Sequence, residues 1–131
     1  MSHVDHEAII VTVGGHASAV LDADGPGSHR DGQRGGLARH LRAFAASVCP
    51  RVTELVESGV NGYLSFAVLP DGSKEGWDEA EAGERARDAI VAELRRWVYD
   101  DGSSPVEWVE VEYSHEGAAV LRNGETHEGE R

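Results

Sequence analysis

The clearest pattern of apolar and polar positions runs from Gly62 to Val98. Within it, Tyr63–Leu69 is apolar except for Ser65, which is typical of a strand that is covered on most of both faces. Pro70–Ser73 should end this strand, because proline donates no backbone hydrogen bond and glycine tolerates positive φ angles. We therefore predict a central strand followed directly by a turn.

An amphipathic helix is predicted after that turn. Asp78 is the expected N-cap, and Glu81 follows it at the spacing of a capping box. Asp100–Gly102 should end the helix. The apolar side chains that recur along one helical face are Ala86, Ile90, Leu94 and Trp97.

The N-terminal third predicts a hairpin and then a flexible loop. Ala8–Val13 is a β-branched strand, and Gly14-Gly15 is a signal for a tight turn into a weaker return strand at His16–Asp22. The glycine-rich segment 23–36 is predicted to be flexible. The same prediction applies to the polar terminal segments, residues 1–7 and 123–131.

A second helix is predicted between that loop and Gly59. Its apolar positions keep a helical spacing throughout, at Leu37, Leu41, Phe44, Val48, Val52 and Leu55. Pro50 falls inside the pattern. Because the apolar phase continues across it, we favour one helix kinked at Pro50 over two separate helices.

The C-terminal part predicts another hairpin, with strands at Val106–Tyr113 and Ala118–Arg122 joined by a turn at Ser114–Gly117. The two faces of its first strand differ: Val109, Val111 and Tyr113 lie on one, and Trp108, Glu110 and Glu112 on the other.

These elements predict an α+β fold in one two-layer domain spanning residues 1–131. The order is β-β-α-β-α-β-β, with about five strands in one sheet and two helices on one of its faces.

Charge narrows the classes of partner. The chain has a formal net charge of −12, from 24 acidic and 12 basic residues, and Lys74 is its one lysine. This balance opposes direct binding to nucleic acid or to anionic membranes and favours a basic protein partner. Because the N-terminus does not resemble a signal peptide and no apolar run approaches about 20 residues, we expect a cytoplasmic protein without a membrane span.

No catalytic, metal or cofactor site is predicted. The N-terminal cluster of His3, Asp5 and His6 lacks the ordered setting that metal ligands need. Cys49 has no base placed beside it on its helix and is interpreted as a core residue. The segment Asp22–Gly32 is similar to a calcium loop that starts at Asp22, but it departs from one because Pro26 stands at position 5 and the following Gln33 at position 12.

Two surfaces are candidates for interaction. The segment Gly72–Trp77 carries Lys74 and Trp77, and Trp77 is either a staple on the helix start or an anchor for a partner.

The other candidate is the outer face of the C-terminal hairpin. With a four-residue loop, Glu112 should face Ala119 and Glu110 should face Leu121, with Trp108 diagonal to Leu121. An apolar pair ringed by carboxylates would suit an interface, and cover by the first hairpin or the tail is the alternative.

The runs PDGSKEGWDEAEAGERARDA and DDGSSPVEWVEVEY are similar to segments of small acidic proteins from actinobacteria and their phages. The resemblance covers roughly the C-terminal half of the chain. Those proteins carry no assigned function, so the resemblance implies a source and no chemistry.

Three functions stay open on the sequence. The first is a non-enzymatic interaction protein of the immunity, anti-restriction or nucleic-acid-mimic type, whose carboxylates complement a basic partner. The second is a small-molecule binder or small enzyme with a pocket between the sheet and the helices. The third is a structural homodimer with Trp108 and Leu121 at its two-fold axis.

Overall fold

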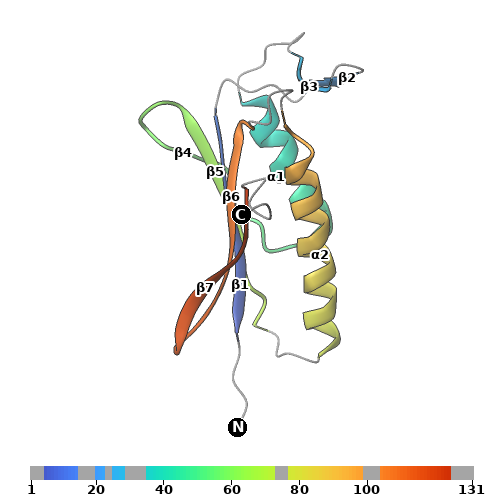
Figure 1. The fold of residues 1–131 in the computed structure, drawn as a ribbon, viewed down its shortest axis with the longest axis vertical. Helices are drawn as coiled ribbons and strands as arrows, with labels where there is room; N and C mark the ends of the chain where they lie inside the picture. The colour runs from blue at the N-terminus through green and yellow to red at the C-terminus, as the bar shows by residue number, and fades with distance from the viewer. Residues whose placement is uncertain are drawn as a thin grey trace, which may run out of the picture.

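A computed structural model describes residues 5–14, 20–22, 25–28, 35–72, 77–98 and 104–124 (Figure 1). For residues 20–22 and 25–28 it describes the backbone only. The elements in chain order are β1 (His6–Gly14), β2 (Val20–Asp22), β3 (Gly25–Ser28), α1 (Gly36–Val48), β4 (Val56–Glu57), β5 (Tyr63–Val68), α2 (Asp78–Arg95), β6 (Val106–Ser114) and β7 (Gly117–Asn123).

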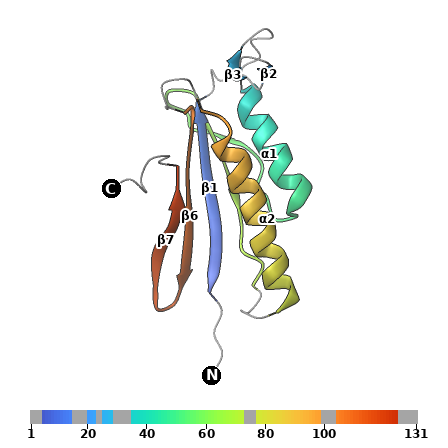
Figure 2. The same ribbon diagram turned by 45° about the vertical axis from the view of Figure 1, so that its right-hand side comes forward.

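Five of the strands form one sheet in the order β4-β5-β1-β6-β7, and all neighbouring pairs are antiparallel. Both helices lie against the same face of this sheet, which leaves two layers (Figures 1 and 2). The predicted α+β class, the number of strands in the sheet and the placement of the helices are therefore confirmed, although β4 takes the place of the predicted strand at His16–Asp22.

The core lies between the sheet and the two helices. β1 is the middle strand and sends Ile9, Val11 and Val13 into the core, where each is fully buried. The helices contribute buried side chains at the predicted spacing, namely Leu37, Leu41, Ile90, Leu94 and Trp97. Cys49 is also buried in this cluster, as expected of a core residue.

The predicted N-terminal hairpin is wrong. β1 pairs with β5 on one side and with β6 on the other, so both of its edges are taken by strands distant in sequence. In the predicted return strand His16–Asp22, only β2 is described, and it pairs with β3 in a separate sheet. The partner strands β5 and β6 carry inward apolar side chains that match those of β1. Their pairing with β1 outweighs the local turn signal at Gly14-Gly15.

The predicted kinked helix is also wrong, because α1 ends at Val48. Cys49 has extended backbone angles, φ −146° and ψ 128°, which is the conformation that a following proline imposes. The chain after Pro50 runs along the sheet, where Val52 bridges to Val68 and β4 forms. Val52 and Leu55 still pack against the core, so the apolar spacing was a core signal in a non-helical segment.

β5 is confirmed as a strand, but it is not covered on both faces. Phe66 and Val68 are buried toward the helices, whereas Tyr63 is exposed and Ala67 only half-buried. The difference arises because both helices cover the same face.

The start of α2 differs from the prediction in its cap. Trp77, not Asp78, is the N-cap, and no side-chain capping bond forms there. The acidic first turn is present, with Asp78, Glu79 and Glu81 near the positive end of the helix dipole.

Parts of the segments predicted to be flexible belong to strands. His6 and Glu7 begin β1, Gly25–Ser28 is β3 and Asn123 ends β7. Residues 1–4, 23–24, 29–34 and 125–131 lie outside the described residues.

Candidate functional site

The C-terminal hairpin presents its faces in the opposite sense to the prediction. Trp108 is 7% exposed and Glu110 is 2% exposed, and Trp108 belongs to the core cluster. Their face therefore points toward the helices, and Val109, Val111 and Tyr113 lie on the outer face. Trp108 is the largest apolar side chain of the strand, so its burial under the helices decides the orientation of every neighbour.

The register of the hairpin differs from the prediction at one end. Ser114 pairs with Gly117, so the loop has two residues, and Glu112 faces Ala119 as predicted. A bulge then intervenes, and Glu110 faces Arg122 in place of Leu121. The bulge leaves Leu121 as the extra residue of β7.

An ion-pair network surrounds Glu110. Arg122 Nε donates to Glu110 Oε1 at 2.6 Å, and Arg87 Nε on α2 lies 3.4 Å from Glu110 Oε2. Arg122 also pairs with Asp88 at 3.0 Å, and Arg87 pairs with Glu7. The hydrogen bond to Glu110 raises the pKa of Arg122. Glu110 therefore joins the sheet to α2, and its burial removes it from the predicted binding surface.

Negative charge remains in excess beside this network. Burial raises the pKa of the Glu7 carboxyl, Arg87 opposes the effect, and Glu112, Glu110 and Glu84 raise it further. Glu7 and Glu112 are direct cross-strand partners on the face that points toward α2. The carboxylates of Glu112, Glu110 and Glu84 therefore add negative charge around Glu7, and Arg87 offsets part of it.

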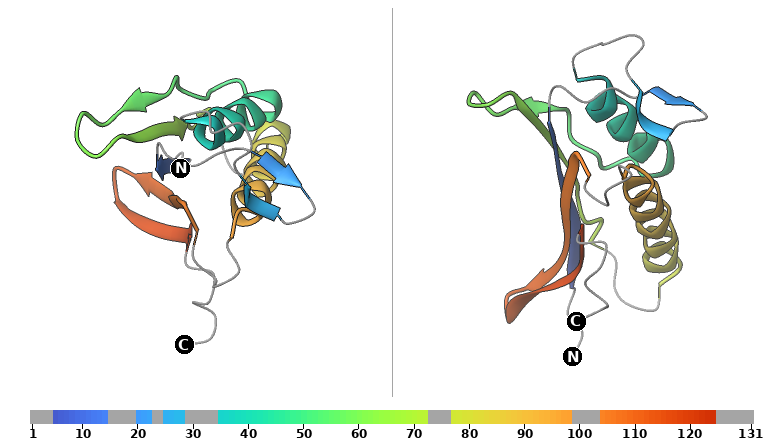
Figure 3. Two further views of the ribbon diagram at one scale, coloured as in Figure 1. Left: turned by 90° about the horizontal axis from the view of Figure 1, so that it is seen from above. Right: turned by 45° about the horizontal axis from the view of Figure 1, so that its top comes forward.

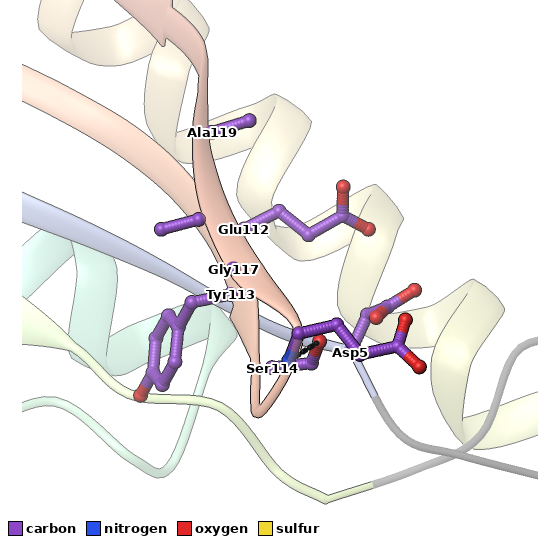
Figure 4. Close-up of a pocket in the computed structure, with 8 residues that line it drawn as sticks. Asp5, Glu112, Tyr113, Ser114, Gly117 and Ala119 are labelled. Atoms are coloured by element: carbon purple, nitrogen blue, oxygen red, sulfur yellow. Dashed lines mark hydrogen bonds between the residues drawn. The ribbon is translucent and has the colours of Figure 1, made fainter.

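A hollow of about 320 Å³ lies at the turn end of the hairpin (Figure 4). Its acidic side chains are Asp5, Glu112 and Glu116, and the residues that line it include no lysine or arginine. In Figure 4 the carboxylates of Glu112 and Asp5 project to one side of the hairpin, and the ring of Tyr113 projects to the other. The remaining lining is small: Ser114, Gly117, Ala118 and Ala119.

A second buried carboxylate joins the two helices. Oε2 of Glu93 accepts from His40 Nε2 at 2.8 Å and from Trp97 Nε1 at 3.2 Å, and Oε1 accepts from Arg96 at 2.8 Å. Burial alone would raise the pKa of Glu93, but these hydrogen bonds outweigh it and the pKa is lowered. The group is satisfied within the fold, which indicates a structural role.

The outer face of the sheet is not covered by either helix (Figure 3). Ile10 is 48% exposed, Val120 59% and Tyr113 38%. Val109 and Val111 lie between them and are half-buried. His6 packs against Tyr113 with the rings tilted by 43° and their centroids 5.3 Å apart. This outer sheet face is an exposed apolar surface, which in soluble proteins commonly marks a contact site.

The predicted site residues are dispersed by the fold. Trp77 is 49% exposed at the N-cap of α2, a position compatible with both predicted roles, the staple on the helix start and the anchor for a partner. Lys74 lies outside the described residues. Leu121 is exposed on β7, and Glu112 is half-buried at the hollow. Of the predicted set, Glu112 alone lines the hollow.

Sequence reasoning missed every lining residue other than Glu112, including the acidic side chains of Asp5 and Glu116. Asp5 reaches the hollow because β1 pairs with β6, and that pairing has no local signal. The placement of Glu116 in the turn of the hairpin could be predicted from the sequence, because Glu116 falls within the predicted turn Ser114–Gly117.

The described ranges contain no group of three His, Cys, Asp or Glu side chains able to hold a metal ion. Neither described helix has the length and apolar composition that a bilayer crossing requires.

The fold and the hollow define a single α+β domain with an acidic recess at one end of its sheet. No protein-family model matches the chain, and no curated protein or solved structure matches it significantly.

Proposed function

We propose that this chain is a non-enzymatic protein-interaction module that binds a basic partner at the hollow of the C-terminal hairpin. The observation that carries the proposal is the lining of this hollow, with three carboxylate side chains and no basic residue. The nearby guanidinium groups of Arg87 and Arg122 are engaged by Glu7, Glu110 and Asp88. A lysine or arginine from a partner would meet an excess of negative charge there.

The overall charge supports the same class of partner. A net charge of −12 accelerates encounter with basic proteins and repels nucleic acid. Immunity and anti-restriction proteins that cover a basic active or nucleic-acid site work on this principle.

Capture of host proteins on the immobilised chain tests this function. The variant is Glu112→Gln/Glu116→Gln, and the matched control is Glu57→Gln/Glu107→Gln, which makes the same charge change at exposed strand positions outside the hollow. We expect the bound protein to be basic and to be lost with the first variant only. Binding should also weaken between about 0.1 M and about 1 M salt, where the Debye length falls from about 10 Å to about 3 Å. Equal capture by both variants would refute the role of the hollow.

A second candidate function, a homodimer through the outer sheet face, is supported by the exposure of Ile10, Tyr113 and Val120. The two-fold axis predicted at Trp108 and Leu121 is wrong in its first residue, because Trp108 is buried. Sedimentation at high concentration decides this candidate. A dimer that Ile10→Glu dissociates supports it, and a monomer rules it out.

A further inference from the structure

Among the residues that the structure describes, β7 forms one edge of the sheet, and the part of this edge from Gly117 to Val120 carries none of the charges or prolines that protect many edge strands. β7 is the last strand in the sheet order, and its run Gly117–Leu121 contains no charged residue and no proline. Ala118, Ala119, Val120 and Leu121 are all exposed. Natural sheets usually guard such edges with charge, proline, bulges or very short strands, and in β7 the bulge at Leu121 and the charge of Arg122 come only after Val120. The opposite edge follows that rule, since β4 has two residues, one of them Glu57.

The unguarded part of the edge runs along the acidic hollow. Gly117, Ala118 and Ala119 line the hollow and belong to β7, and the bulge at Leu121 ends the regular ladder just beyond them. Alternate backbone groups of an antiparallel edge strand point away from their partner strand, so β7 offers donors and acceptors to an extended chain.

The side chains next to this edge fit a basic occupant. Glu112 faces Ala119 on the side that points toward α2, and Ala119 places only a methyl group on that side of the edge strand. A strand added to β7 would lie two strand spacings from β6, about 9.5 Å. An extended lysine or arginine side chain spans most of that distance and would meet the carboxylate of Glu112 above Ala119.

We infer that an extended segment of a partner protein, with lysine or arginine at alternate positions, adds as a strand to the free edge of β7 and places its basic side chains in the hollow. This inference rests on the proposed function and names its mode of binding.

A designed peptide probe tests the inference with the full chain. The probe has about seven residues, the length of a common strand, with arginine and threonine in alternation. One control peptide has the same composition with its arginines in one block. The other keeps the alternation and carries N-methyl groups on alternate backbone nitrogens, which preserves charge and removes the donors along one edge.

We expect the alternating peptide to bind and to slow hydrogen exchange at amides within Gly117–Val120. N-methylation and the block order should each weaken binding about tenfold or more. Glu112→Gln should weaken binding about tenfold, while Glu107→Gln, on the outer face of the same strand, leaves it unchanged.

Three results overturn the inference. If the N-methylated peptide binds equally and the β7 amides are unaffected, strand addition is wrong and salt-dependent capture by the hollow still stands. If the chain self-associates and protects the same amides without peptide, a second copy occupies the edge. If no arginine peptide binds, the inference fails, and the capture experiment with Glu112→Gln/Glu116→Gln then decides the proposed function separately.

Discussion

Arg122 Nε on β7 donates a hydrogen bond to Glu110 Oε1 on β6 at 2.6 Å, and Glu110 is only 2% exposed. The bulge at Leu121 makes this contact possible, because it shifts the register by one residue and brings the arginine opposite the glutamate. Glu110, which the sequence predicted to bind a partner, therefore holds the hairpin against α2.

Arg122→Ala should therefore destabilise the fold by about 3 kcal/mol, because it leaves a buried carboxylate with weaker compensation. Urea denaturation measures the loss. Glu110→Leu in the Arg122→Ala background should restore part of it, since the stranded charge is then absent. A loss below about 1 kcal/mol in the single variant would show that Arg87 suffices for Glu110.

Trp108→Ala should cost about 3–5 kcal/mol, because the side chain fills the core between β6 and the helices. Trp77→Ala is the matched control at an exposed position and should change the free energy of unfolding by less than about 1 kcal/mol. Thermal and urea unfolding compare the two. Comparable losses would contradict the reversed orientation of the hairpin.

Glu93 should make the fold less stable in acid. Its folded pKa lies below the ordinary glutamate value of 4.5, so its contribution is present above that value and is lost as the pH falls through the lowered one. Glu93→Gln should cost about 2 kcal/mol at neutral pH. The difference from wild type should shrink below pH 4.5, and a difference constant with pH would oppose an ionised Glu93.

Glu7 should act in the opposite direction. Its folded pKa is raised above 4.5, so its contribution is present below that value and is lost as the pH rises through the raised one. The stability of Glu7→Gln relative to wild type should therefore increase as the pH rises from about 4 toward neutrality. Glu107→Gln, at an exposed position, controls for the general change in charge. A relative stability that falls over this range would contradict the raised pKa.

Elements with strong periodic patterns were predictable. The strand at β5, the buried face of α2 and the hairpin β6–β7 each carry their signal within one continuous stretch of the chain. Glu112 facing Ala119 was also predictable, because a hairpin fixes the register near its turn.

Pairing over long distances was not predictable in the same way. The Gly14-Gly15 signal favoured a local hairpin, yet β1 took β5 and β6 as neighbours. The spacing of Val52 and Leu55 suggested helix, yet both residues reach the core from an extended segment after Pro50. Apolar residues three or four positions apart indicate that their side chains are buried. They do not by themselves indicate a helix, because an extended segment after a helix can bury residues at the same spacing.

The sequence by itself determined the α+β class, the acidic surface and the main apolar faces, because each depends on composition or on neighbours within one element. The tertiary structure decided which face of the C-terminal hairpin meets the helices and which carboxylates gather at its end. Those outcomes depend on the space in the core that buries Trp108 and on the charged partner of Glu110. Both come from distant parts of the chain, through the packing of α2 and the pairing of β1 with β6.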